Sequence, residues 1–430
     1  MSAATSTLPR SAVDAKLISI ISAGAVAFGV ALTGFVQNEP APYEIYMAGL
    51  IGIWALLGLT ISLSTASLLT MLVFFNVGGM ISMTQMGDLG DAPMYIAVSI
   101  FLALTSVFLA AVIEKRVGLL TAIFNAWVVA ACATGTLGIL GYFNAFPGAD
   151  RFTLYNRASG AFQDPNVFGP FLVLPAIWLL HGLMTARVAK MPLQAAGLLL
   201  LSIGIFLSFS RGAWGLYAFA AIGLCGALFL NAARNVVRLR IIVMGLIGIG
   251  LVAIAIVVAL QIPAVASLFE TRAQLVQDYD GARLGRFARF GIGFMLAMER
   301  PIGIGPLVFG TLFGEDTHNI WLKALMDYGW LGFAAFLTLV VWTLAGAFRI
   351  VFRARPWQPF LLCATLVFAG HIMLGTVIDM DHWRHFYLLI GIIWGCMGLE
   401  ARHQLELARR SPANFQNPRD YALALQKPSL

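Results

Sequence analysis

The sequence has little charge. Only 11% of its 430 residues are Asp, Glu, Lys or Arg, 60% are hydrophobic, and the mean hydropathy is +0.86. A soluble domain carries about 25% charged residues, so this composition excludes an ordinary soluble protein. Apolar runs of about 20 residues, the length that crosses a hydrocarbon core, recur along the chain. We therefore expect a polytopic membrane protein in which helices satisfy the backbone polar groups.

Charged residues are missing from the middle of these apolar runs. Such a residue would cost about 2.5–3.5 kcal/mol on insertion, and ion-coupled transporters usually keep ionisable residues there. His371 is the one ionisable candidate at that depth, and we expect it to be a hydrogen-bonded packing residue. The predicted fold is all-α with about twelve transmembrane helices. The expected spans are 17–37, 46–63, 66–85, 92–113, 119–143, 167–184, 192–209, 212–231, 240–260, 329–348, 358–378 and 384–400.

Cysteine is scarce, and other signatures of bound groups are weak. The cysteines are Cys132, Cys225, Cys363 and Cys396, all inside expected spans, which argues against disulfides or a zinc site. The segment "IDMDHWRHF" gathers Asp379, Asp381, His382, Arg384 and His385 in the last outer turn, but its spacing matches no metal signature. The glycines of "GIGFMLAMERPIGIG" do not follow a strand, so they do not indicate a dinucleotide site. We predict no cofactor and no metal.

Basic residues are unevenly distributed over the connections. With the N-terminus inside, seventeen of the 27 Lys and Arg residues fall on the inner side, as the positive-inside rule requires. We therefore expect a cytoplasmic N-terminus at 1–16, a membrane domain at 17–400 and a cytoplasmic tail at 401–430. An outer loop is expected at 144–166 and a long outer segment at 261–328, between the ninth and tenth spans. The net charge of +7 then reflects topology and does not indicate nucleic-acid binding.

The remaining basic residues lie on the outer side. They are Arg151, Arg157, Arg211, Arg272, Arg283, Arg286, Arg289, Arg300, Lys323 and Arg384. A guanidinium group binds phosphate through two parallel hydrogen bonds, so gathered outer arginines indicate an anionic ligand such as a lipid diphosphate. Arg211, in "SFSRGAWG", lies where a span ends, although snorkelling is an alternative. Arg283, Arg286 and Arg289 are spaced to share one side of a helix, which could also meet lipid headgroups.

Two further outer segments carry candidate groups. "TLFGEDTHNIW" places His318 and Asn319 before an amphipathic run, and histidine is suited to accept a proton near neutral pH. "RASGAFQDPNVFG" offers Arg157, Asp164 and Asn166 ahead of a span. Asp164 and Asn166 could equally cap that helix, and the two interpretations stay open.

Four of these motifs occur in a recognisable order. "RASGAFQDPNVFGPFL", a span ending in "SFSRGAWG", "GRFARFGIGFMLAMERPIGIGP" and "HNIWLKALMDYGWLG" follow one another between residues 157 and 333. In order and spacing they resemble the O-antigen ligase and O-antigen polymerase family of bacterial inner-membrane proteins. One departure is Asp327, where the family commonly has Glu, and the change is conservative.

The resemblance implies a GT-C-like membrane glycosyltransferase that uses an undecaprenyl-diphosphate-linked glycan at the periplasmic face, without a nucleotide sugar. Matched to the family motifs, Arg211 and Arg286 are expected to be catalytic arginines and His318 the base, with Arg157 on the diphosphate. Substrate binding is further expected of Asp164, Asn166, Arg283, Arg289 and Asn319. The implied reaction inverts the anomeric centre.

The acceptor stays open between lipid A-core, a growing polysaccharide and a protein. Other expected partners are the lipid bilayer and polysaccharide assembly proteins.

Two alternatives belong to other functional classes. A lipid-linked-oligosaccharide flippase or export transporter needs a central polar pathway, which these spans do not supply. A scaffold for envelope assembly would tolerate loss of His318 or Arg211.

Overall fold

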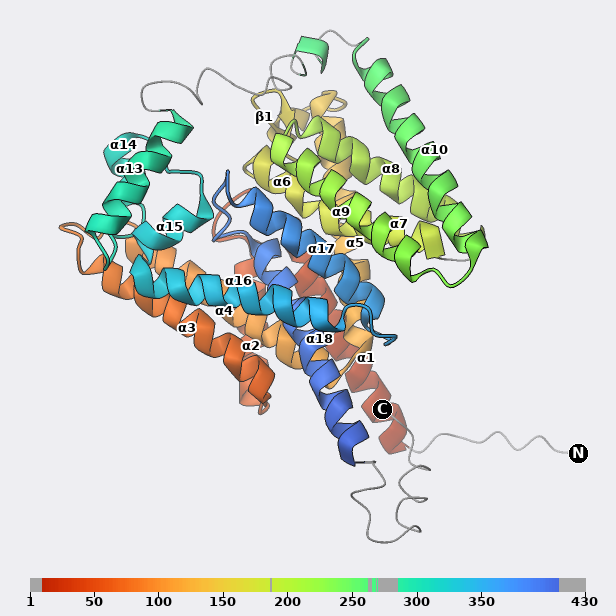
Figure 1. The fold of residues 1–430 in the computed structure, drawn as a ribbon, viewed down its shortest axis with the longest axis horizontal. Coiled ribbons are helices and arrows are strands. Elements are labelled where there is room, and N and C mark those ends of the chain that lie inside the picture. The colour runs from red at the N-terminus through yellow and green to blue at the C-terminus, as the bar shows by residue number, and fades with distance from the viewer. Residues whose placement is uncertain (1–9, 186–187, 262–264, 268, 270–284, 410–430) are drawn as a thin grey trace, which may run out of the picture.

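The computed structural model describes residues 10–185, 188–261, 265–267, 269 and 285–409. Helices make up most of this part of the chain, which confirms the predicted all-α class (Figure 1). They are α1 (Arg10–Leu32), α2 (Pro42–Leu56), α3 (Leu63–Met83), α4 (Ala92–Lys115), α5 (Gly118–Tyr142), α6 (Pro165–Phe171), α7 (Val173–Thr185), α8 (Met191–Leu207), α9 (Arg211–Asn231), α10 (Asn235–Ala259), α13 (Arg286–Glu299), α14 (Val308–Phe313), α15 (Ile320–Asp327), α16 (Gly329–Ile350), α17 (Gln358–Leu374) and α18 (Arg384–Arg409). Short 3-10 helices occur at Ala149–Phe152 and Val188–Lys190. Strands β1 (Thr153–Leu154) and β2 (Arg157–Ala158) form one small antiparallel hairpin.

Helices lie at each of the predicted spans. Within the described ranges, six helical segments are long and apolar enough to cross a membrane: Leu63–Met83, Ala92–Lys115, Gly118–Tyr142, Pro165–Thr185, Arg211–Asn231 and Gly329–Ile350. Lys16–Leu32, Met191–Leu207 and Gln358–Leu374 are shorter apolar helices. The chain is therefore an all-α protein with several helices capable of spanning a membrane, while the number twelve stays a prediction.

One predicted span is interrupted. The segment expected at 167–184 forms α6 and α7, which are separated at Leu172. Pro175 has no backbone N–H to donate to the carbonyl of Phe171, four residues earlier. That carbonyl instead accepts the indole N–H of Trp127 from α5 at 3.2 Å. A buried side chain thus satisfies the acceptor that the proline leaves open.

Helices α4 and α18 form the centre of the bundle (Figure 1). Small residues let them approach closely, because a β-carbon at Gly395 would lie 2.7 Å from Ile113 Cβ, and one at Gly391 would lie 2.8 Å from the Ser106 carbonyl oxygen. Small residues four apart are typical of membrane helices whose backbones touch. Ser106 Oγ also donates to the carbonyl of Tyr387 across this contact, at 2.6 Å.

The two ends of the bundle differ. Figure 1 shows the start of α1 and the end of α18 at the lower right, and helices α13, α14 and α15 on the left. The end that carries α13 to α15 also holds the turn between α17 and α18, because Ile320 N donates to the carbonyl of Gly375 at 2.8 Å. The segments predicted on the outer side therefore lie toward the end of the bundle opposite the described chain ends.

Candidate functional site

Arg157 joins the small hairpin to two helices. It lies in β2 and is buried, and its Nε donates to the carbonyl of Ser208 at 2.8 Å. Its Nη2 donates to Asn166 Oδ1 at 2.7 Å. Asp164 Oδ1 accepts the backbone N–H of Asn166 at 2.7 Å and so caps α6. The capping interpretation of Asp164 is confirmed, and three of the predicted residues lie together.

Arg211 stands at the first position of α9. The turn before it is tight, since Phe209 is buried with φ +46°, and Ser210 Oγ accepts the N–H of Ala213 at 3.4 Å. The positive end of a helix favours an anion and disfavours a cation, so a guanidinium there is best balanced by a negative group. Arg157 donates to the carbonyl of Ser208, so its side chain contacts the same turn that leads into Arg211.

His318 is paired with Asp379. Its Nδ1 lies 2.9 Å from Asp379 Oδ1, and the two side chains are 35% and 19% exposed. Burial would raise the pKa of Asp379, but the hydrogen bond to His318 and the charge of Lys323 outweigh it, so the pKa lies below its usual value. The ionised carboxylate can only accept, which places the proton on Nδ1 and the lone pair of the neutral ring on Nε2.

Three hydrogen bonds of the Asn319 side chain hold the backbone next to His318. Asn319 Oδ1 caps α15 by accepting the N–H groups of Trp321 and Leu322 at 3.0 and 3.1 Å. Its Nδ2 donates to the carbonyl of Thr376 at 3.0 Å. His318 itself has φ +50°, a left-handed conformation that is uncommon outside glycine and is enriched at functional sites. Asn319 therefore positions His318, and its contact with substrate stays a prediction.

One junction of helices brings these groups to the same end of the bundle. Gly169 of α6 packs against the Ser208 turn, where a β-carbon would lie 2.8 Å from Ser208 Oγ. Gly212, beside Arg211, packs so tightly on Leu374 at the end of α17 that a β-carbon would collide with it. The next residue, Gly375, accepts from Ile320 of α15. The segments that carry Arg157, Arg211 and His318 are thus linked by a chain of contacts through α6, α9, α17 and α15, and their meeting in one site stays a prediction.

Of the predicted residues Arg283, Arg286 and Arg289, the structure describes the side chain of Arg289 alone. Arg283 lies outside the described residues, as does the side chain of Arg286, whose backbone begins α13. Arg289 is buried, and its Nη1 lies 2.5 Å from Glu315 Oε2. That guanidinium faces a protein carboxylate, and its contact with a substrate stays a prediction.

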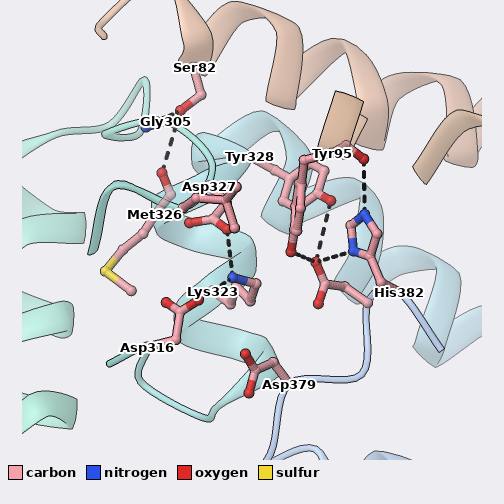
Figure 2. Close-up of polar contacts among 12 residues, drawn as sticks. Ser82, Tyr95, Gly305, Asp316, Lys323, Met326, Asp327, Tyr328, Asp379 and His382 are labelled. Atoms are coloured by element: carbon pink, nitrogen blue, oxygen red, sulfur yellow. Dashed lines mark hydrogen bonds and ion pairs between the residues drawn. The ribbon is translucent and has the colours of Figure 1, made fainter. Parts of the chain in front are cut away.

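A buried ionic cluster surrounds Lys323 and includes Asp379, the partner of His318, and sequence reasoning missed it (Figure 2). Lys323 Nζ lies 2.7 Å from Asp316 Oδ2 and 2.9 Å from Asp327 Oδ2, and the lysine side chain is 3% exposed. The sequence signal was the spacing of Lys323 and Asp327, four residues apart on one helix. We call these three residues, together with Asp379 and Asp381, the Lys323 cluster.

Asp381 anchors the other side of the cluster. Its Oδ2 accepts from the hydroxyl of Tyr95 at 2.5 Å and lies 3.1 Å from Nδ1 of His382 (Figure 2). Burial would raise the pKa of Asp381, but His382, Lys323 and Tyr95 hold it well below its usual value. The acids of "IDMDHWRHF" therefore bind protein donors. Among the described residues no group of three or more His, Cys, Asp or Glu side chains is arranged to hold a metal ion.

His371 takes the predicted packing role. It is fully buried in α17, and its Nδ1 lies 2.8 Å from the carbonyl oxygen of Val367. This geometry confirms the expectation of a hydrogen-bonded core histidine.

A comparison with protein-family models gives a match to this chain. Residues 196–337 match the model of a family described as O-antigen ligase. No curated protein sequence matches the chain. The matched region includes Arg211, Arg286 and His318, whereas Arg157 and Asp379 lie outside it. The match supports the O-antigen ligase/polymerase family that the motifs resemble, a family of glycosyl-transfer enzymes. With the apolar helices, it supports a multi-pass inner-membrane protein.

Proposed function

From the O-antigen ligase match we propose that the protein transfers a glycan from an undecaprenyl-diphosphate carrier to an acceptor hydroxyl at the periplasmic face. The observation that carries this proposal is the His318–Asp379 pair at the outer end of the bundle, joined through α17 to the turn that holds Arg211. A base beside a cationic turn is what glycosyl transfer from a lipid diphosphate requires, because an alcohol must lose a proton while a diphosphate gains charge.

His318 acts as the general base. Asp379 holds the Nδ1–H, so Nε2 takes the proton of the acceptor hydroxyl. The oxygen attacks the anomeric carbon, the bond from that carbon to the diphosphate oxygen breaks, and undecaprenyl diphosphate leaves with the electron pair. A single displacement of this kind inverts the anomeric configuration. General base catalysis contributes about 10²–10⁴-fold, which sets the scale of loss expected without the imidazole.

The arginines stabilise the leaving diphosphate. Arg211 stands at the positive end of α9, where the helix dipole adds to its charge. Arg157 binds the carbonyl of Ser208 and thereby fixes the turn that presents Arg211. Arg286 begins α13 and is proposed to complete the anion site from the other segment. Preorganised donors of this kind favour the transition state because charge builds on the diphosphate as the bond breaks.

Genetic complementation tests the proposal. In a strain lacking the gene, we expect wild-type protein to restore long glycan chains, and His318→Gln and Arg211→Ala to fail while present in the membrane. His403→Gln, on the distant part of α18, serves as the matched control and should restore them. Full complementation by both site variants would refute the proposal.

The same strain identifies the acceptor. Long chains that accumulate on the undecaprenyl carrier without reaching lipopolysaccharide indicate a ligase. Single repeat units alone indicate a polymerase. Normal glycan on the carrier at the cytoplasmic face, with none at the periplasmic face, would indicate the flippase alternative.

A further inference from the structure

The Lys323 cluster surrounds one buried ammonium group. Lys323 lies between Asp316, on the loop before α15, and Asp327, on the same helix (Figure 2). Its Nζ also lies 5.3 Å from the centre of the Tyr95 ring of α4, within cation–π range. A lysine buried to this extent is rare unless it is paired, so the charge is held there by its partners.

The acids around Lys323 outnumber it. Asp316 and Asp327 contact the ammonium, while Asp379 and Asp381 approach from the turn between α17 and α18. Other titratable groups at the cluster are His318, His382, Tyr95, Tyr328 and Tyr387. His382, Tyr95 and Tyr328 contact Asp381, and Tyr387 interacts with its charge. An excess of negative charge in a buried place must be relieved by proton uptake or by hydrogen bonds.

The titration of the cluster agrees with this geometry. Burial would lower the pKa of Lys323, but the four carboxylates raise it well above its usual value, so the ammonium stays charged. Burial raises the pKa of Asp327 to about 7 despite the opposing charge of Lys323. Asp327 can thus take up a proton and so relieve the excess negative charge, whereas Asp379 stays ionised beside His318.

The cluster also fixes the position of α15. Asn319 and Ile320 bind the end of α17 at one end of the helix, and Lys323 and Asp327 anchor its other half. Tyr95 and Tyr328 bind Asp381 and tie the turn between α17 and α18 to α4 and α16. His318 and Asp379 come from these two tied segments, so their separation depends on the cluster.

We propose that Lys323 is a positioning residue for the His318–Asp379 pair, whose buried ammonium anchors α15 and opposes protonation of His318 while Asp379 holds the Nδ1–H. The effect of Lys323 on catalysis rests on the proposed function, whereas its effect on His318 does not. The state of His318 itself is measurable without any substrate.

The test is a titration of the histidine ring by 15N solid-state NMR of the full-length protein, labelled on histidine, in lipid bilayers. The chain has six histidines, and the His318 signals are identified by their loss in His318→Gln. In the wild type we expect the neutral ring to carry its proton on Nδ1. Removal of the ammonium should favour the imidazolium, because one opposing positive charge is lost.

Three variants measure the effect. Lys323→Met should raise the pH midpoint of His318 by about one unit, a tenfold change in proton affinity. Asp316→Asn should lower it, because the ammonium is then less neutralised. Lys115→Met, at the exposed end of α4 far from the cluster, should leave it unchanged. If Lys323→Met does not fold, the double variant Lys323→Met with Asp327→Asn removes the unpaired buried acid and should still raise the midpoint.

The outcomes separate the two proposals. An unchanged His318 midpoint in the folded Lys323 variants overturns the role of Lys323, whatever the transfer activity. A shifted midpoint together with full complementation by His318→Gln leaves the electrostatic inference intact and refutes the function. A wild-type ring protonated on Nε2 in its neutral form would overturn the tautomer assignment and, with it, the inference.

Discussion

At the scale of single residues, the site depends on a carboxylate that lies 61 residues from its histidine. The acids of "IDMDHWRHF" stood out in the sequence, but nothing in their spacing indicated His318 as a partner. The pairing depends on the turn between α17 and α18 returning to α15, a tertiary contact that one sequence does not contain. The motifs around Arg157, Arg211 and His318 could be found because they are local.

We expect Asp379→Asn to lower glycan transfer by about 10²–10⁴-fold. An asparagine can offer its N–H₂ group to Nδ1, which favours the wrong tautomer. The pKa of Asp379 lies below its usual value, so its ionised form stabilises the fold above the unfolded pKa of about 3.9, and this contribution is lost as the pH falls through the folded pKa. Between pH 5 and 9 Asp379 should therefore stay charged.

The rate of transfer in membranes across this pH range checks the prediction, with exposed Asp88→Asn as the control. The acid limb of the wild-type profile should reflect His318. Activity of Asp379→Asn within about twofold of the wild type would contradict the role of the carboxylate.

Arg157→Lys should destabilise the protein and reduce transfer. Arg157 uses Nε for Ser208 and Nη2 for Asn166, and a lysine ammonium cannot reproduce this planar fork. A buried acceptor left without its donor costs about 1–3 kcal/mol. Arg151 lies on the same loop and is exposed, and its side chain donates to the nearby carbonyl of Gly148, so Arg151→Lys is the matched control. Equal thermal stability of the two variants in detergent would show that the fork is dispensable.

At the scale of elements, the helices were the most predictable part, because hydropathy and length are local properties that the membrane itself imposes. The exact ends of the helices and the breaks within them were less predictable. The interruption at Leu172 requires the Trp127 indole from α5 as well as Pro175, and only the proline is visible locally. The short helix α15 was expected as an amphipathic run, but the burial of Lys323 within it depends on acids from three segments.

The contact between α3 and α16 gives a prediction at this scale. A β-carbon at Gly78 would collide with the carbonyl oxygen of Tyr328 and lie 2.6 Å from the backbone N of Gly332. Backbone atoms cannot yield as a side-chain end can, so Gly78→Ala should push α16 away and destabilise the protein by about 1–3 kcal/mol. Because Tyr328 follows Asp327, transfer should fall as well.

The control is Gly49→Ala on α2, where nothing lies within 4 Å of the new carbon. It should be neutral or slightly stabilising, because alanine favours the helix. Thermal unfolding in nanodiscs compares the two variants. A Gly78→Ala protein as stable as Gly49→Ala would mean that α3 and α16 do not pack this closely.

At the scale of the whole molecule, the proposed reaction requires the site to face the periplasm. The segments that carry Arg157, Arg211 and His318 are linked by contacts toward one end of the bundle, and the described chain starts and ends toward the other (Figure 1). By the positive-inside rule, the excess of basic residues on the connections at that second end predicts that it lies in the cytoplasm. A donor anchored by its polyprenyl chain can then meet the arginines at headgroup level on the opposite side.

Two glycines at the ends of α4 test this orientation. Gly87 precedes the helix and Gly118 follows it, both are exposed, and a β-carbon at either meets nothing within 4 Å. At 24 residues α4 is about 36 Å long, enough to place them on opposite sides of a membrane. With the natural cysteines replaced by alanine, Gly87→Cys should react with an impermeant maleimide that has entered the periplasm of whole cells. Gly118→Cys should react only after lysis. The reverse pattern would put His318 in the cytoplasm, where a periplasmic donor cannot reach it, and the proposed reaction would fail with it.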